Sequence, residues 1–167
     1  MRVLNRWSAV VLGAVAAGVL LFPSVAQAAP GSDIGVVVGP TDTSRGLPPG
    51  ITSTLPFPFS AGDCTQLGGG SPAFQSEVRL DKPDASGRSR FTWDAFTYTR
   101  HTNNADIWHG TFRFRTAFGT PVLTVGPFDS VPMRATFHTY TTERSTPVTI
   151  DPALFDAITQ VDWLGDC

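Results

Sequence analysis

The sequence contains little of what most catalytic and nucleic-acid-binding sites are built from. It has two cysteines, three histidines and a single lysine, Lys82, in 167 residues. No Gly-x-Ser-x-Gly sequence marks a serine nucleophile, and no run of basic residues offers a surface for nucleic acid. We therefore expect a protein that is not an enzyme, that holds no cofactor or metal, and that binds no nucleic acid.

The two cysteines are Cys64 and Cys167, the last residue. An even number of cysteines in an exported protein favours a disulfide, with intermolecular pairing or a free thiol as the alternatives. No histidine lies close to either cysteine in the sequence, which argues against a metal site. A Cys64–Cys167 bond would close a loop of about 100 residues and stabilise the fold by about 4.7 kcal/mol in the chain-entropy model.

Residues 1–28 have the features of a secretory signal peptide. Arg2 and Arg6 precede an apolar run, and an Ala-Gln-Ala sequence ending at Ala28 is a small-x-small cleavage site. A membrane anchor is the alternative, but the apolar run is shorter than the roughly 20 residues that span a bilayer. Cleavage would leave 139 residues, enough for one domain, with ten basic and 14 acidic residues. We expect the mature protein to be secreted and to have no membrane partner.

Residues 29–60 are rich in glycine and proline, and within them residues 34–38 alone have the β-branched composition of a strand. Such a segment buries little apolar surface, so we expect it to be extended. Two interpretations are open. The segment lies along the domain as an edge strand, or it is an arm that inserts into a partner's cleft or adds a strand to the partner's sheet. In the second interpretation the binding residues are Ile34, Val36, Val37 and Val38.

Residues 91–118 give the clearest indication of the fold. The segments 91–99 and 107–118 are typical of two strands, joined by the polar loop 100–106 as in a β-hairpin. Alternate positions of the second segment are aromatic, small or threonine on one face. The other face is polar except at its two ends, Ile107 and Ala117, so the segment alternates with a period of two. The first set comprises Trp108, Gly110, Phe112, Phe114, Thr116 and Phe118. We expect this face, and the face that carries Phe91 and Trp93, to be buried.

Further β-segments separated by glycine and proline turns are predicted at residues 74–80, 121–125, 133–140, 147–150 and 158–164, with a turn at 141–146. Asp151 followed by Pro152 predicts the start of a short helix over residues 152–159. This pattern predicts that residues 61–167 form an all-β domain, either a sandwich or a barrel. We expect an antiparallel β-sandwich with one short C-terminal helix, closed by the disulfide.

Three sets of polar residues offer weaker alternatives. These are His101, His109 and His138 for zinc, a pair from Asp94, Asp106 and Asp129 for glycoside hydrolysis, and Asn103, Asn104 and Asp106 for calcium. Surface histidines, chance pairs among many carboxylates and turn formation explain the same residues, and we prefer those explanations. Trp93, Trp108, Trp163 and Tyr98 could form a sugar-stacking platform or an interface hot spot. We expect the tryptophans to fill the core and Tyr98 and Tyr140 to lie nearer the surface.

The order of these features resembles the small adapter subunit of umbrella toxin particles, which are secreted bacterial assemblies. The resemblance covers the whole mature chain. It consists of the signal peptide, the glycine- and proline-rich segment at residues 29–50 and the β domain from Cys64 to Cys167. It includes no specific motif and therefore assigns no residue. The resemblance implies that the arm docks in a larger, lectin-bearing subunit while the β domain contacts the toxin subunit.

We predict a secreted, non-enzymatic protein–protein interaction module, an adapter that links subunits of an extracellular assembly such as a toxin particle. The alternatives are a carbohydrate-binding module and a secreted hydrolase inhibitor. Its partners would be other secreted proteins, or carbohydrate. On the β domain, the predicted partner-binding residues are Tyr98, Arg100, His101, Asn103 and Asn104.

Overall fold

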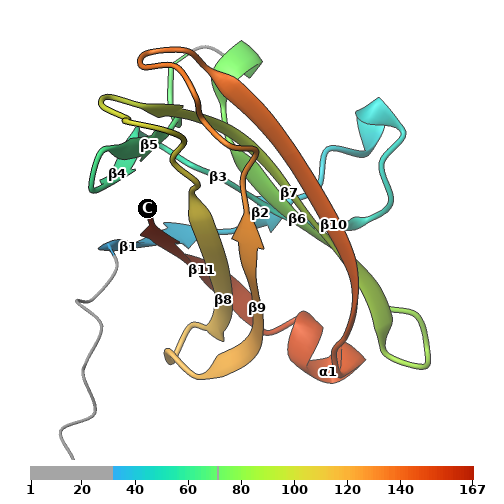
Figure 1. Cartoon of the computed structure of the whole chain (residues 1–167). Helices are drawn as coiled ribbons and strands as arrows, with labels where there is room; N and C mark the ends of the chain where they lie inside the picture. Colours follow the sequence, from blue (N-terminus) through green and yellow to red (C-terminus); the bar gives the residue numbers. More distant parts are fainter. Residues whose placement is uncertain (1–31, 71) are drawn as a thin grey trace, which may run out of the picture.

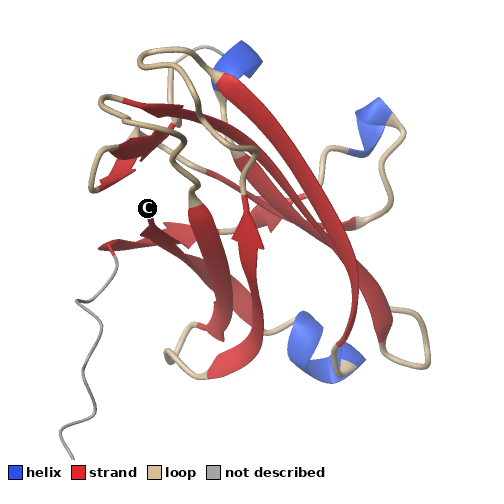
Figure 2. Ribbon diagram, in the orientation of Figure 1, coloured by secondary structure: helices blue, strands red, loops and turns tan. Residues whose placement is uncertain are grey.

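The chain folds into an antiparallel β-sandwich with one short helix and a Cys64–Cys167 disulfide, as Figures 1 and 2 show. This computed structural model describes residues 32–70 and 72–167, so the predicted signal peptide lies outside the described residues. The strands are β1 (Ser32–Val37), β2 (Gly39–Pro40), β3 (Gly50–Thr54), β4 (Phe59–Ala61), β5 (Cys64–Gln66), β6 (Glu77–Asp81), β7 (Arg88–Thr99), β8 (His109–Thr116), β9 (Pro121–Asp129), β10 (Tyr140–Thr149) and β11 (Ile158–Asp166). The helix is α1 (Pro152–Phe155), and 3-10 turns cover Thr43–Arg45 and Pro72–Phe74. The predicted fold class is confirmed.

Two sheets of unequal size form the layers. The smaller sheet has the order β1-β11-β8-β9, and the larger has the order β2-β3-β6-β7-β5-β4. β7 is long enough for β6 and β5 to pair with successive parts of one edge, while β10 pairs with the other edge. In the described residues no helix is long and apolar enough to cross a membrane.

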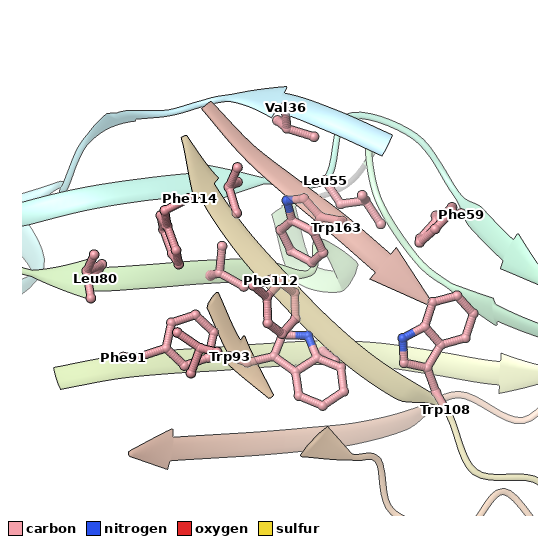
Figure 3. Packing of buried hydrophobic residues seen from close by; sticks show 14 of the residues in the cluster. Val36, Leu55, Phe59, Leu80, Phe91, Trp93, Trp108, Phe112, Phe114 and Trp163 are labelled. Carbon is pink, nitrogen blue, oxygen red and sulfur yellow. The ribbon is translucent and has the colours of Figure 1, made fainter. Parts of the chain in front are cut away.

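The two strands predicted at residues 91–118 are present, but they do not form a hairpin. β7 belongs to the larger sheet and β8 to the smaller one, so the loop 100–106 crosses between the layers. Both strands carry an aromatic face, and these aromatic side chains are most completely buried when the two faces oppose each other across the core. The ring centroids of Phe91 and Phe112 are 5.2 Å apart, and those of Trp93 and Phe112 are 5.6 Å apart. Figure 3 shows these rings packed between the sheets.

The core confirms the predicted burial of Trp93 and Trp108, and Trp163 is buried beside them. Trp163 on β11 also joins the sheets through a polar contact, because its Nε1 donates a hydrogen bond to Ser53 Oγ on β3 at 3.2 Å. The predicted burial of Phe118 is wrong, since its side chain is 97% exposed. β8 ends at Thr116, and Phe118 lies in the following turn, where the alternation of the strand no longer applies.

The C-terminal prediction is partly wrong. Residues 133–139 are irregular, where we expected a strand at residues 133–140. Residues 140–149 form the long strand β10, where we expected a turn at 141–146 followed by a short strand at 147–150. Phe137 has a φ of 55°, which interrupts any extended backbone there. Pro147 is accommodated because β10 pairs with β7 along one edge, and an edge strand tolerates a missing N–H. The cap is confirmed: the Asp151 side chain accepts a hydrogen bond from Ala153 N at 2.8 Å.

The described part of segment 29–60 is not an extended arm, because it supplies β1 to β4. β1 pairs with β11 and forms the edge of the smaller sheet, which agrees with the edge-strand interpretation. β3 lies inside the larger sheet between β2 and β6. Alternate residues of β1 and the position after it face the core. Val36 lies in the core, and Ile34 and Val38 pack against it. Leu55, between β3 and β4, is fully buried.

Candidate functional site

Four segments meet at one end of the sandwich, which we call the disulfide end. They are the β4–β5 turn at residues 62–63, the loop 100–106, the segment 133–137 and the C-terminus at Cys167. Arg100 bonds to the turn twice, from its N to Asp63 O at 2.9 Å and from its guanidinium to Gly62 O at 2.8 Å. The disulfide holds Cys167 against Cys64, which begins β5. Covalent and hydrogen bonds therefore fix loops that would otherwise be mobile.

Asp106 is the residue that joins these segments. Its carboxylate accepts a hydrogen bond from Thr99 Oγ1 at 2.5 Å, and its backbone exchanges two hydrogen bonds with Met133. In the described residues, Asp106 and the two cysteines are the one set of three metal-ligand groups with atoms within 4.8 Å of one another. Both sulfur atoms are consumed by the disulfide, so this set does not bind a metal in the oxidised protein. Asp106 has a structural role here and holds the loop to the sheet.

The most unusual residue of this end is Phe137. Its backbone is held in the left-handed region, φ 55°, by a hydrogen bond from its N to Thr99 O at 2.8 Å. A left-handed conformation costs a bulky residue roughly 1–2 kcal/mol. Its ring nevertheless stays in solvent, 73% exposed, and stacks on Tyr98 with centroids 6.2 Å apart and planes inclined by 30°. A backbone in a costly conformation therefore carries an exposed aromatic side chain.

The structure brings together the five residues predicted on the β domain, because Tyr98 leads into the loop that carries Arg100, His101, Asn103 and Asn104. All of them except Tyr98, which is half-buried, are exposed.

The four residues predicted on the arm lie in or directly after β1 instead. Val36 is in the core and Ile34 and Val38 pack against it, so these three side chains are committed to the fold. Val37 alone points outward, with 79% of its surface exposed.

Sequence reasoning missed Phe137. The residue lies in a stretch whose alternation predicted a strand, and it is not glycine or asparagine, the residues that usually signal a left-handed backbone. No local pattern in the sequence identifies it. Its position follows from the parallel bridge between Thr99 and Thr136, which depends on the tertiary fold.

A second candidate surface is a groove of about 340 Å³ on the outer face of the larger sheet. Antiparallel register places Thr54, Glu77, Asp94 and Glu143 directly opposite one another across β3, β6, β7 and β10. Strands in a sheet lie about 4.8 Å apart, so the register creates a polar row across four strands. The remaining lining residues are Arg45, Gln75, Phe96 and Thr141.

Asp94 occupies the middle of this row. Partial burial raises the pKa of its carboxyl group, and the negative charge of Glu143 raises it further. Arg79 and Arg45 oppose that effect, while Glu77 adds to it. The folded protein therefore holds a proton on Asp94 more tightly than an unfolded chain would.

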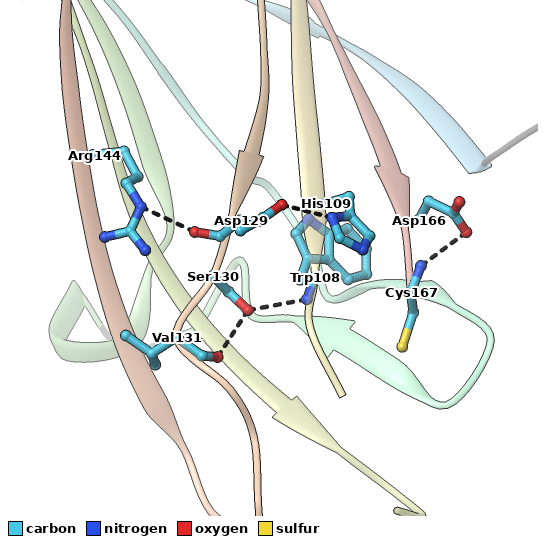
Figure 4. Close-up of polar contacts among 8 residues, drawn as sticks. All are labelled: Trp108, His109, Asp129, Ser130, Val131, Arg144, Asp166 and Cys167. Carbon is cyan, nitrogen blue, oxygen red and sulfur yellow. Dashed lines mark hydrogen bonds and ion pairs between the residues drawn. The ribbon is translucent and has the colours of Figure 1, made fainter. Parts of the chain in front are cut away.

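A third polar cluster lies where the start of β8 pairs with the end of β9 (Figure 4). His109 Nδ1 and Asp129 Oδ1 are 2.7 Å apart on the paired strands β8 and β9. Ser130 follows, but its hydroxyl accepts a hydrogen bond from Trp108 N and donates one to Val131 O, both at 2.9 Å. The hydroxyl is thus engaged in fixing the β9–β10 connection.

The weaker acidic and histidine alternatives can be compared with the positions of their residues in the fold. In the part of the chain that the structure describes, the three histidines are not among ligand groups gathered within 4.8 Å. Asp94 lies on the outer face of the larger sheet, Asp106 at the disulfide end and Asp129 on β9 of the smaller sheet. In the described residues, the three carboxylates therefore come from three different parts of the fold.

Comparison with known proteins adds no relative: no protein-family model, no curated protein and no solved structure matches this chain.

Proposed function

We propose that this chain is a protein-binding module of a secreted assembly and that its disulfide end is the contact surface. The observation that supports this most directly is Phe137, exposed and strained on top of Tyr98. Exposure alone does not distinguish it, because Phe118 is exposed too. Phe137 differs because the fold incurs a backbone cost to present it, and such strain is concentrated at functional positions.

The chemistry of the surrounding residues suits a protein partner. Interface hot spots are enriched in aromatic residues and arginine, surrounded by polar side chains that exclude water. Tyr98 and Phe137 supply the aromatic centre, and Arg100, His101 and Arg134 supply polar groups on the same end. The disulfide and Asp106 fix the loops in advance, which lowers the entropy lost on binding.

The proposed setting is a multisubunit assembly outside the cell, in which this chain acts as an adapter. The signal-peptide features of residues 1–28 and the disulfide favour export. The resemblance to the adapter subunit of umbrella toxin particles makes a toxin assembly the kind of complex to test first. In this proposal the partner is another secreted protein that receives the aromatic pair in an apolar pocket.

The test compares two variants that each remove one exposed phenylalanine. Phe137→Asn removes the ring and suits the left-handed backbone. Phe118→Asn removes an even more exposed ring from the β8–β9 turn at the opposite end of β8. Each tagged protein is expressed with its leader, purified from culture supernatant, and its co-eluting proteins are identified by mass spectrometry. We expect wild type and Phe118→Asn to retain the same stoichiometric partner and Phe137→Asn to lose it. Equal retention by all three proteins would refute the disulfide end as the contact surface.

A further inference from the structure

The groove on the larger sheet has the composition of a small-ligand site. None of its lining residues belongs to the disulfide end, although Phe96 lies two residues before Tyr98 on β7. Its lining residues come from four strands and two connecting segments, which fixes their relative positions. A volume of about 340 Å³ falls within the range of ordinary ligand pockets. Such pockets combine an apolar surface with a few polar groups that converge on the ligand.

An aromatic ring provides the apolar surface. Phe96 lines the groove, and Phe74 braces it edge-on, with ring centroids 5.9 Å apart and planes at 83°. The backbone around Phe96 is also fixed, because Ser76 Oγ accepts a hydrogen bond from Phe96 N at 3.0 Å. A braced ring beside polar side chains presents a flat surface for the apolar face of a ligand.

The charges in the groove restrict what can bind. Carboxylates at Glu77, Asp94 and Glu143 repel an anion, and the guanidinium of Arg45 offsets part of their negative charge. Hydrogen-bonding capacity of both kinds remains, because carboxylates accept, the guanidinium donates, and Gln75 and the two threonines do both. A neutral ligand with several hydroxyl groups, each able to donate and accept, matches this set.

We propose that this groove binds a neutral pyranose unit of a glycan, with one face of the sugar ring stacked on Phe96 and its hydroxyl groups bonded to the polar row. The site is distinct from the disulfide end, so it does not depend on the proposed protein-binding function. Asp94, in the middle of the row, holds a proton more readily than an ordinary aspartate does. Its carboxylate can accept a hydrogen bond from a hydroxyl group of the sugar.

The experiment records backbone amide NMR spectra of the mature protein while neutral tetrasaccharides of glucose, mannose, xylose and N-acetylglucosamine are added. Final concentrations of about 10 mM cover affinities in the millimolar range. We expect at least one of them to shift the signals of Gln75, Phe96 and Thr141. A tetramer of galacturonic acid serves as the anionic probe and should leave these signals unchanged.

Two variants test the assignment of the site. Phe96→Leu keeps an apolar side chain but removes the ring, and Glu143→Gln removes a charged acceptor; each should weaken binding of the active tetrasaccharide about tenfold. Phe118→Leu is the matched control and should bind as wild type does. Four results would each overturn the proposal: no shift with any neutral tetrasaccharide, shifts confined to the disulfide end, equal binding of the anionic probe, or undiminished binding by Phe96→Leu.

The outcome is separable from that of the protein-binding proposal. Phe137→Asn should keep saccharide binding, and Phe96→Leu should keep the co-eluting partner. If Phe137→Asn and Phe96→Leu both lost saccharide binding, or both lost the partner, a folding defect would be the explanation. The amide spectra check this directly, because a folded sandwich gives dispersed signals close to those of wild type.

Discussion

Cys64 and Cys167 are 103 residues apart in the sequence and are joined by a disulfide that ties the two sheets together. Cys64 is the first residue of β5 in the larger sheet, and Cys167 follows the last residue of β11 in the smaller one. The Cα atoms are 5.8 Å apart, which is an ordinary separation for a disulfide. This single bond closes the end of the sandwich that carries Tyr98, the loop 100–106 and Phe137.

Removing the disulfide should destabilise the whole domain. In the double variant Cys64→Ala, Cys167→Ala, we expect the free energy of unfolding to fall by about 3–5 kcal/mol, because the unfolded chain regains the entropy of a loop of about 100 residues. Urea titration followed by tryptophan fluorescence measures the change. Hydrogen exchange should also accelerate first at residues 100–106 and 133–137. An unchanged urea midpoint would show that the bond constrains neither the folded nor the unfolded state.

Asp94 should make the fold less stable as the pH rises. Burial, and next the charge of Glu143, raises its pKa in the folded state, so folding favours the protonated form. The associated stability is present below the unfolded pKa, for which 3.8 is the ordinary value, and is lost as the pH rises through the folded pKa. Asp94→Asn should therefore be more stable than wild type at pH 7. Removing the repulsion between Asp94 and each neighbouring glutamate, Glu143 and Glu77, should contribute up to about 1 kcal/mol. The difference should vanish in acid.

Asp84→Asn is the control of opposite sign. Hydrogen bonds from the Ser86 side chain and then from Arg88 N lower the pKa of Asp84. Its contribution to stability is present above the unfolded pKa and is lost as the pH falls through the folded pKa. Asp84→Asn should thus be less stable than wild type at pH 7, and equal in acid. The urea midpoints of Asp94→Asn and Asp84→Asn are compared with that of wild type at pH 7 and in acid. At pH 7, a shift of the same sign in both variants would contradict the electrostatic explanation.

Residue alternation predicted much of the fold but could not assign strands to sheets. The period of two at residues 107–118 identified β8 and its buried face, since alternation is a local property of the strand. The assignment of β7 and β8 to different sheets depends on which aromatic faces oppose each other, as Phe91 and Phe112 do. A seven-residue polar loop is compatible with a hairpin and with a crossing between layers. The local pattern therefore could not show whether β7 and β8 belong to one sheet or to two.

Those parts of the candidate sites that depend on local composition could be predicted from the sequence. Those that depend on how distant strands pair could not. Tyr98 and the loop after it were identified from an exposed aromatic next to turn-forming residues. The row of Glu77, Asp94 and Glu143 arises from the pairing of three strands that are distant in the sequence. The left-handed Phe137 likewise depends on a hydrogen bond to Thr99, 38 positions earlier. Neither feature leaves a pattern within one segment.

The backbone strain at Phe137 can be measured by comparing two substitutions that both remove the ring. Asparagine tolerates the left-handed region and alanine does not, so Phe137→Asn should be more stable than Phe137→Ala by about 1 kcal/mol. Loss of the contact with Tyr98 is common to both variants and cancels. The same pair of substitutions at Phe118, whose φ is not positive, should show no such advantage for asparagine. Equal stability of the two Phe137 variants, measured by thermal unfolding, would mean that the conformation is unstrained.

The packing of Trp108 should make Gly165 intolerant of any side chain. A Cβ atom at Gly165 would overlap the Trp108 ring, 2.6 Å from its Cη2, and would lie 2.9 Å from Phe59 Cε1. Both rings are buried, and neither can move without opening the core beside the disulfide. Gly165→Ala should lower the free energy of unfolding by about 1–3 kcal/mol. Gly39→Ala is the matched control, because a Cβ there meets no atom within 4 Å, and its effect should stay within about 0.5 kcal/mol. Urea unfolding of both variants tests the comparison, and equal midpoints would show that the ring of Trp108 can move aside at little cost.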